Sequence, residues 1–233
     1  MIRKPLRYWQ SREGISEGRP DLEMAINSSV EKTTEGSKNA QRPESSKSFP
    51  KNRLPDMLVR TYLQMTDWSQ FHPAYLNYLD GIKLMCMGTP DVAFYRFLHT
   101  AIGRQWHWRD RLYLLDEEIE ALLLDPGTSV HVLYVQGAPA GYIELVQRKE
   151  GSTGRFFSTE IVYFGLRPSY MGRGLGKHLL SHGIAYAWNK GTQRLWLHTS
   201  NLDGSQALDN YIKRGFKIYR VEKEPMPEHY LQP

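Results

Sequence analysis

Residues 157–190 read FSTEIVYFGLRPSYMGRGLGKHLLSHGIAYAWNK. The part from Glu160 to Leu166 is rich in apolar, β-branched and aromatic residues, which predicts a strand, and Pro168 ends it. Beyond the next turn, apolar side chains recur every three or four positions, which predicts an amphipathic helix. Glycines separate the two elements at alternate positions: Gly172, Gly174 and Gly176. The stretch is therefore a strand, a glycine turn and a helix.

This order predicts a site for a ligand that carries phosphate. The first amides of a helix have no partner within the helix, and glycines let phosphate oxygens approach them. A dinucleotide fingerprint begun at Gly172 would need glycine at Lys177. A P-loop ending at Gly176 would need glycine at Met171 and a hydroxyl at His178. Neither pattern fits, and an ordinary strand-to-helix turn remains the alternative.

Composition limits the classes of function. The chain of 233 residues is 40% hydrophobic and 12% aromatic, as expected of a globular protein with a sizeable core. Its formal charge of +5 suits an anionic ligand. The sequence has no recognition helix, zinc-finger spacing or aromatic RNA-binding strand, so we expect no nucleic acid partner. The single cysteine, Cys86, excludes an internal disulfide and a multi-cysteine metal site, so we expect no metal and a reducing compartment, the cytoplasm.

Two regions of the chain differ in composition. Residues 1–53 are dominated by Ser, Glu, Lys, Gly, Pro and Asn, and we expect this extension to be disordered or loosely attached. Residues 54–233 are expected to form the folded domain. No apolar run approaches the roughly 18–20 residues of a membrane span, and no signal or transit peptide is predicted, so we expect no membrane partner. The oligomeric state stays open.

The folded domain alternates between strand and helix patterns. Alternating apolar residues predict strands over 58–65, 130–135, 140–146, 160–166, 194–199 and 216–221. Helical periods with capping residues predict helices over 91–103, 116–125, 175–188 and 205–214. Residues 74–90 have no clean period, so strand, loop and helix all stay open there, and Gly151 to Gly154 predict a loop.

Three segments resemble the GCN5-related N-acetyltransferase (GNAT) superfamily, especially its uncharacterised bacterial members. Residues 171–176 resemble the pyrophosphate loop (Gln/Arg)-x-x-Gly-x-(Gly/Ala), with Met171 where the family prefers Gln or Arg. Residues 160–166 are similar to the fourth strand of the family. Residues 207–216 resemble its Ala-x-x-x-Tyr-x-x-x-Gly-Phe segment, with Gly204 where the family usually has Asn. The order of predicted elements is also that of the superfamily.

The resemblance implies an α+β fold. This GNAT-like sandwich has a mixed, mostly antiparallel central sheet with a splayed strand pair, and helices on both faces. Acetyl-CoA is the implied co-substrate, and its pantetheine lies between the splayed fourth and fifth strands. Asn201 is a candidate replacement for the asparagine that is absent at Gly204. The other implied cofactor-binding residues are Phe164, Gly165, Leu166, Met171, Gly172, Arg173, Gly174, Leu175, Gly176 and Lys177.

The resemblance also implies the acid and the base of the reaction. Some members carry a general-base glutamate at the position of Glu160, and Tyr211 matches the tyrosine that protonates the departing thiolate. Alternation along the strand predicts that Glu160 shares a face with Val162 and Phe164, where burial raises its pKa. Glu144 on the preceding strand is a second candidate base. A strand-end carboxylate in a salt bridge and a core tyrosine are the structural alternatives.

Four more residues are candidates on the acceptor side. His198 on the fifth strand could relay a proton, although a hydrogen-bonded strand histidine is the simpler interpretation. Trp106, His107 and Trp108 lie in the loop between the first two helices, which covers the acceptor site in this superfamily. Their rings could stack on an acceptor, and aromatic packing that anchors the loop is the alternative.

We therefore expect an acetyl-CoA-dependent N-acetyltransferase. The expected acceptor is a primary amine of a small molecule, which attacks the thioester directly in a ternary complex. A protein lysine or N-terminus, presented by a peptide, is the second acceptor class. A non-catalytic acyl-CoA-binding or interaction module is the alternative from another class, and the departures at Met171 and Gly204 favour it.

Overall fold

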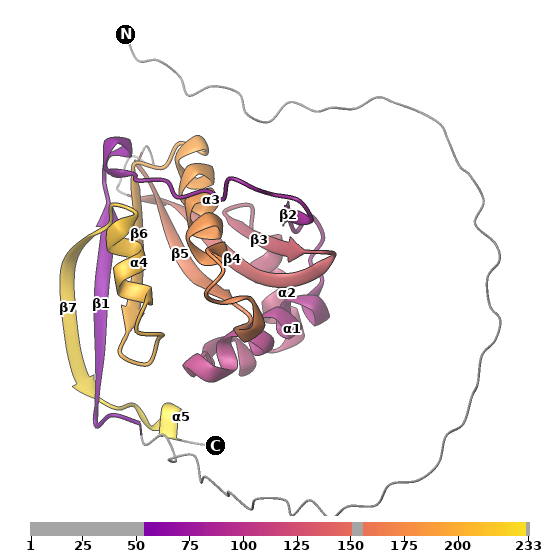
Figure 1. Ribbon diagram of the computed structural model, residues 1–233. Helices are drawn as coiled ribbons and strands as arrows, with labels where there is room; N and C mark the ends of the chain where they lie inside the picture. Colours follow the sequence, from indigo (N-terminus) through magenta and orange to yellow (C-terminus); the bar gives the residue numbers. More distant parts are fainter. Residues whose placement is uncertain (1–53, 151–155, 232–233) are drawn as a thin grey trace, which may run out of the picture. The chain divides into compact units, whose positions relative to one another are not determined.

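The computed structural model describes residues 54–150 and 156–231 (Figure 1). The predicted extension 1–53 and the predicted glycine loop lie outside the described residues. The strands are β1 Met57–Met65, β2 Ile82–Cys86, β3 Thr128–Val135, β4 Ala138–Glu150, β5 Phe156–Leu166, β6 Arg194–Ser200 and β7 Lys217–Pro225. The α-helices are α1 Val92–Gly103, α2 Asp116–Leu124, α3 Leu175–Asn189, α4 Ala207–Lys213 and α5 Glu228–Leu231.

The seven strands form one sheet in the order β2-β3-β4-β5-β6-β1-β7. Only the β5–β6 pair is parallel, which confirms the expected mixed, mostly antiparallel sheet. Apolar clusters form on both faces, one with α1 and α2 and the other with α3 and α4. Tyr142 and Ile143, neighbours on β4, belong to opposite clusters, as the two-residue period of a strand requires. The expected α+β sandwich is confirmed.

The first three α-helices begin where the sequence predicts, whereas α4 begins two residues later and α5 was not predicted. The Asp91 carboxylate accepts a hydrogen bond from the amide of Phe94 at 2.8 Å and caps α1. Acidic residues occupy the first turn of α2, where they are stabilised by the helix dipole. None of the helices in the described part of the chain is both long and apolar enough to cross a membrane.

β1, the first strand of the described residues, pairs with strands from the C-terminal part of the chain. β1 pairs antiparallel with β6 on one side and β7 on the other, with Leu63 opposite Leu197 (Figure 1). The strand that precedes α1 and borders β3 is β2, within the region 74–90 that showed no clear period. The expected element order, which has a single strand before α1, is therefore wrong. β2 has no alternation because it is a short edge strand with three of its five side chains exposed.

β5 and β6 separate after a short parallel pairing. The pairing runs from Ser158 opposite Arg194 to Glu160 opposite Trp196, and both strands continue beyond it without pairing to each other. The splayed strand pair is thus present at the expected place. Because a gap between backbones needs side chains or a ligand to fill it, this separation positions the site described below.

A β-bulge changes the side-chain pattern of β5. Glu144 lies opposite Tyr163 and Leu145 lies opposite Ile161, so one residue of β5 has no partner on β4. Val162 therefore packs with the cluster under α1, whereas Phe164 packs with the cluster under α3. The prediction that simple alternation places Glu160, Val162 and Phe164 on one face is wrong for this reason.

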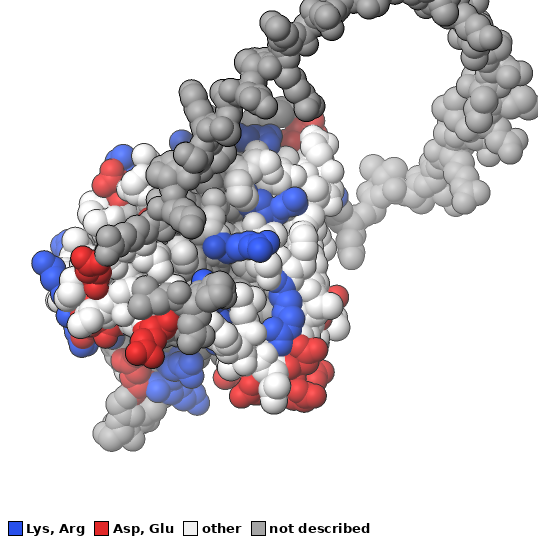
Figure 2. Space-filling model, turned by 90° about the horizontal axis from the view of Figure 1, so that it is seen from below, with Lys and Arg blue, Asp and Glu red and all other residues white. Residues whose placement is uncertain are grey.

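The surface drawn in Figure 2 carries charges of both signs. Basic side chains lie across the middle of this face and are separated by uncharged residues, while acidic side chains gather towards its lower edge and one side.

The junction of α4 and β7 allows a test of the fold. Gly215 has φ +103°, and a Cβ at this position would lie 1.7 Å from the carbonyl oxygen of Gln70. We expect Gly215→Ala to lower the free energy of unfolding by at least about 2 kcal/mol, because it adds backbone strain and a clash with the main chain. Urea denaturation measures this change. Gly88→Ala, where a Cβ has no neighbour within 4 Å, is the control, and equal stability of the two variants would contradict the packing described.

Candidate active site

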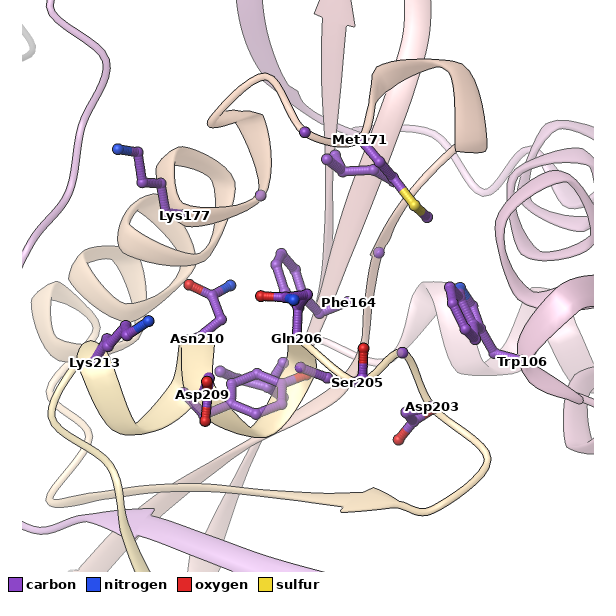
Figure 3. Close-up of a pocket in the computed structure, with 18 of the residues that line it drawn as sticks. Trp106, Phe164, Met171, Lys177, Asp203, Ser205, Gln206, Asp209, Asn210 and Lys213 are labelled. Carbon is purple, nitrogen blue, oxygen red and sulfur yellow. The ribbon is translucent and has the colours of Figure 1, made fainter. Parts of the chain in front are cut away.

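A cavity of about 710 Å³ opens where β5 and β6 separate (Figure 3). Its walls come from the second half of β5, the glycine turn before α3, the middle of β6, the β6–α4 loop with α4, and the loop after α1. The lining residues that the sequence predicted are Trp106, Trp108, Phe164, Gly165, Leu166, Met171, Gly172, Gly174, Gly176, Lys177, His198 and Tyr211. The structure therefore gathers residues that are far apart in the sequence around one cavity.

The glycine turn presents bare backbone to the cavity. Gly172 and Gly174 both have φ +75°, a conformation that glycine adopts without strain. Gly174 is the N-cap of α3, and its carbonyl accepts the first helical hydrogen bond, from the amide of His178 at 3.3 Å. The amides of Leu175, Gly176 and Lys177 precede that bond, so they have no partner within the helix. This end of the cavity can therefore bind an anion.

Two lysines and a methionine also line the cavity. Lys177 and Lys213 line the cavity, and Figure 3 shows both at the end away from Trp106. Met171 also lines it with 38% of its surface exposed. Arg173 does not line the cavity, and its guanidinium lies over the Tyr170 ring, 5.7 Å from the centroid. The lysines that line the cavity therefore come from α3 and α4.

The other predicted cofactor residues lie outside the lining. Leu175 is only 2% exposed and belongs to the core under α3. Asn201 is engaged at the start of β1: its side-chain amide donates to the carbonyl of Met57 at 2.9 Å and accepts from the amide of Val59 at 3.0 Å. It therefore joins the β6–α4 loop to β1 and does not face the cavity.

The sequence interpretation missed most of the contribution of α4. Gln206, Asn210 and Lys213 line the cavity, and their spacing of four and three residues is that of one helix face. This polar stripe could have predicted a face that lines the cavity, because the buried tyrosine of the same short helix lies at a different position. The remaining lining residues that were missed are Ile161, Val162, Asp203, Gly204, Ser205, Ala207 and Asp209.

Tyr211 lies at the wall between α4 and β5. Its side chain is buried, and its ring contacts the Phe164 ring edge-on at 6.0 Å. Its hydroxyl makes no hydrogen bond to any residue in the described part of the chain. Burial, and to a smaller extent the charge of Asp203, raises the pKa of Tyr211 above its usual value. The phenol therefore stays protonated near neutral pH and can donate a proton into the cavity.

Glu160 and His198 face each other where the strands begin to separate. Glu160 Oε1 is 3.9 Å from His198 Nδ1. Burial raises the pKa of Glu160, and the positive charge of Arg148 opposes part of this rise. Burial also lowers the pKa of His198 below its usual value. His198 makes no hydrogen bond to the described residues.

Glu144 is held in a different environment. Its carboxylate accepts a hydrogen bond from the Tyr95 hydroxyl at 2.6 Å and forms an ion pair with Arg111 at 3.1 Å. The side chain is 2% exposed and does not line the cavity. These contacts are those of a buried structural ion pair beneath α1.

The two tryptophans after α1 have different positions. The Trp108 ring packs where a Cβ on Gly103 or Gly165 would lie, and it contacts the Tyr163 ring at 5.0 Å. It therefore anchors the loop against β5, as the packing alternative predicted. His107 between them has left-handed backbone with φ 58° and does not line the cavity.

Trp106 reaches across the opening to the β6–α4 loop. A Cβ on Gly204 would lie 3.1 Å from the Trp106 indole, so the absence of a side chain at position 204 makes room for this ring. The departure from the usual asparagine at this position thus has a physical reason. Trp106 bounds the cavity at the end away from the lysines (Figure 3), and Gly204, which also lines the cavity, lies against its ring.

Comparison with known proteins agrees with this geometry. Residues 94–216 match the profile of the acetyltransferase (GNAT) family. No curated protein matches the chain. A solved GCN5-related N-acetyltransferase from Sphaerobacter thermophilus is similar with a TM-score of 0.51 and 17% identity, over 73% of this chain and 52% of that one. An aminoglycoside acetyltransferase from an uncultured soil metagenomic sample is similar with a TM-score of 0.50 and 16% identity, over 58% of this chain and 88% of that one.

At these identities the solved structures show a shared fold. The family profile goes further, because it covers more than half of the 233 residues and includes β5, the glycine turn, α3 and α4. The chain belongs to the acetyltransferase (GNAT) family.

Proposed function

We propose that the protein transfers an acetyl group from acetyl-CoA to the primary amine of a small molecule, by direct attack in a ternary complex. The observation that carries this proposal is the cavity itself. It extends from a glycine turn with two nearby lysines to Tyr211 and His198, through the gap between β5 and β6. A ligand with phosphates at one end and a reactive group at the other fits this distribution of groups.

Named groups in the cavity would hold the cofactor. The free amides at the start of α3, with Lys177 and Lys213, suit the phosphates because they combine hydrogen-bond donors with positive charge. Beyond Glu160, the edge of β5 that faces the gap has no partner strand among the described residues. Gly165 and Leu166 lie there, and such an edge can hydrogen-bond an extended amide chain such as pantetheine.

The chain supplies the groups that move protons. Acetyl-CoA, when bound, provides the activated thioester. Glu160 is the base that takes up the proton lost by the attacking ammonium, either directly or through a neighbouring group, and its raised pKa suits a base that works near neutral pH. Backbone amides of β5, with that of Leu166 as the candidate, stabilise the negative charge that develops on the carbonyl oxygen. Tyr211, which lines the cavity, then gives its proton to the departing sulfur and regains one from the newly acylated nitrogen.

A small acceptor is favoured by the end of the cavity that Trp106 bounds. The indole lies against Gly204, so this end is closed by side chain and loop together. A lysine or N-terminus on a peptide is the second acceptor class, and thiol release with a panel of amines and peptides separates the two. A binding module without activity would take up acyl-CoA and release no thiol with any acceptor.

The first prediction about the proposed function concerns the anion site at the glycine turn. Gly174→Asp places a carboxylate at the N-cap of α3, where its charge repels phosphate, so we expect CoA affinity to fall by at least about tenfold. Isothermal titration calorimetry with CoA measures this change. Gly191→Asp is the matched control, because Gly191 also has positive φ, at +83°, and lies beyond the other end of α3 with no atom within 4 Å of a Cβ. Equal loss of affinity in both variants would contradict the assignment.

The second prediction concerns the thiolate acid. Tyr211→Phe removes the hydroxyl and keeps the ring that packs on Phe164, so we expect kcat to fall by roughly 10²-fold while CoA affinity stays nearly unchanged. Release of CoA thiol under saturating substrates measures kcat. Tyr186→Phe, on α3 outside the cavity, is the control and should keep the wild-type rate. A wild-type rate in Tyr211→Phe would make Tyr211 a core residue only.

A further inference from the structure

His198 and Glu160 differ in their access to the cavity. His198 is among the lining residues and Glu160 is not. The side chain of His198 is 42% exposed, whereas that of Glu160 is 19% exposed. An acceptor amine that enters the cavity therefore meets the imidazole before it reaches the carboxylate.

Packing supports the His198 imidazole on one side, and the ring can still rotate. His198 lies opposite Tyr62 of β1, and the two rings pack at 5.7 Å with a tilt of 39°. This contact supports one side of the imidazole, and no hydrogen bond from the described residues holds its nitrogens. The 3.9 Å between Nδ1 and Glu160 Oε1 exceeds a hydrogen bond, and a small rotation of the ring or one bridging water would connect them.

We propose that His198 is the catalytic residue that takes the proton from the attacking amine, and that Glu160 receives a proton from the other side of the same ring. This inference rests on the proposed function and specifies its proton path. The amine arrives as an ammonium ion and gives one proton to Nε2 of His198, while the Nδ1 proton passes to the Glu160 carboxylate. The freed lone pair then attacks the thioester carbonyl. When the product leaves, Glu160 returns its proton to Nδ1 and Nε2 releases its proton to water, which restores the starting state of the ring.

The surrounding charges are compatible with this path. Four groups act on the His198 ring: Glu160 from β5, Asp203 from the β6–α4 loop, Asp110 from the loop before α2, and Arg60 from β1. Burial lowers the pKa of His198 most, Arg60 adds to the decrease, and the two aspartates oppose it. The ring is therefore neutral near pH 7 and able to accept a proton. Because burial also raises the pKa of Glu160, the two proton affinities lie closer together than in water.

The test compares His198→Gln with the wild type over a range of pH. We expect kcat/KM of His198→Gln to fall by about 10²-fold or more, with unchanged affinity for CoA. In the wild type, kcat/KM rises with pH through the pKa of His198, because only the neutral ring accepts a proton. That pKa lies below the usual value of 6.5, and His198→Gln should lose this step of the profile.

Two further variants sharpen the result. His72→Gln, at an exposed position outside the cavity, should keep both the rate and the profile. Glu160→Gln should lose less activity than His198→Gln and keep the histidine step, since His198 still contacts the amine. Circular dichroism of each variant confirms that it is folded.

The possible failures are distinguishable. If the wild type acetylates an amine and His198→Gln keeps its rate and profile, Glu160 acts directly and this inference is wrong while the proposed function stands. If Glu160→Gln loses more activity than His198→Gln, the order of the relay is wrong. If the wild type transfers no acetyl group to any amine or peptide of the panel, the proposed function is wrong and the inference is wrong with it.

Discussion

The site depends on the loss of backbone pairing between β5 and β6 after Glu160. Unpaired amides and carbonyls are costly when they are buried, so a gap between two strands persists only where water or a ligand can reach it. Here the gap is a cavity, and the proposed groups that line it come from β5, the glycine turn with α3, β6 and α4. The glycine turn, α4 and the Trp106 loop lie around this one interruption of the sheet.

Strand pairing elsewhere in the sheet compensates for the lost pairing between β5 and β6. β6 loses β5 as a partner along half its length, yet β1 pairs with its other edge from Arg60 to Met65 and β7 continues the sheet beyond β1. The bulge in β5 turns Val162 and Phe164 towards opposite faces, so both apolar clusters continue past the gap. The N-terminal strand therefore stabilises the half of the sheet that carries His198.

Structural features that depend on the pattern within one segment were predicted from the sequence. Features that depend on pairing between distant segments were not. The glycine turn, α3 and Tyr211 follow from spacing along one segment, and the structure brings them to one cavity. The insertion of β1 beside β6 and the bulge at Val162 depend on contacts between distant segments, which periodicity does not encode. The fit of Trp106 over Gly204 joins positions about a hundred residues apart, so it had no signal in either segment alone.

The central claim is that this cavity binds acyl-CoA in the gap between β5 and β6. A crystal structure with CoA bound tests it most directly. The account predicts the pyrophosphate against the amides of residues 174–177, the pantetheine along Gly165 and Leu166, and the sulfur within hydrogen-bond reach of the Tyr211 hydroxyl. CoA bound outside the gap, or bound with its sulfur away from both Tyr211 and His198, would contradict it.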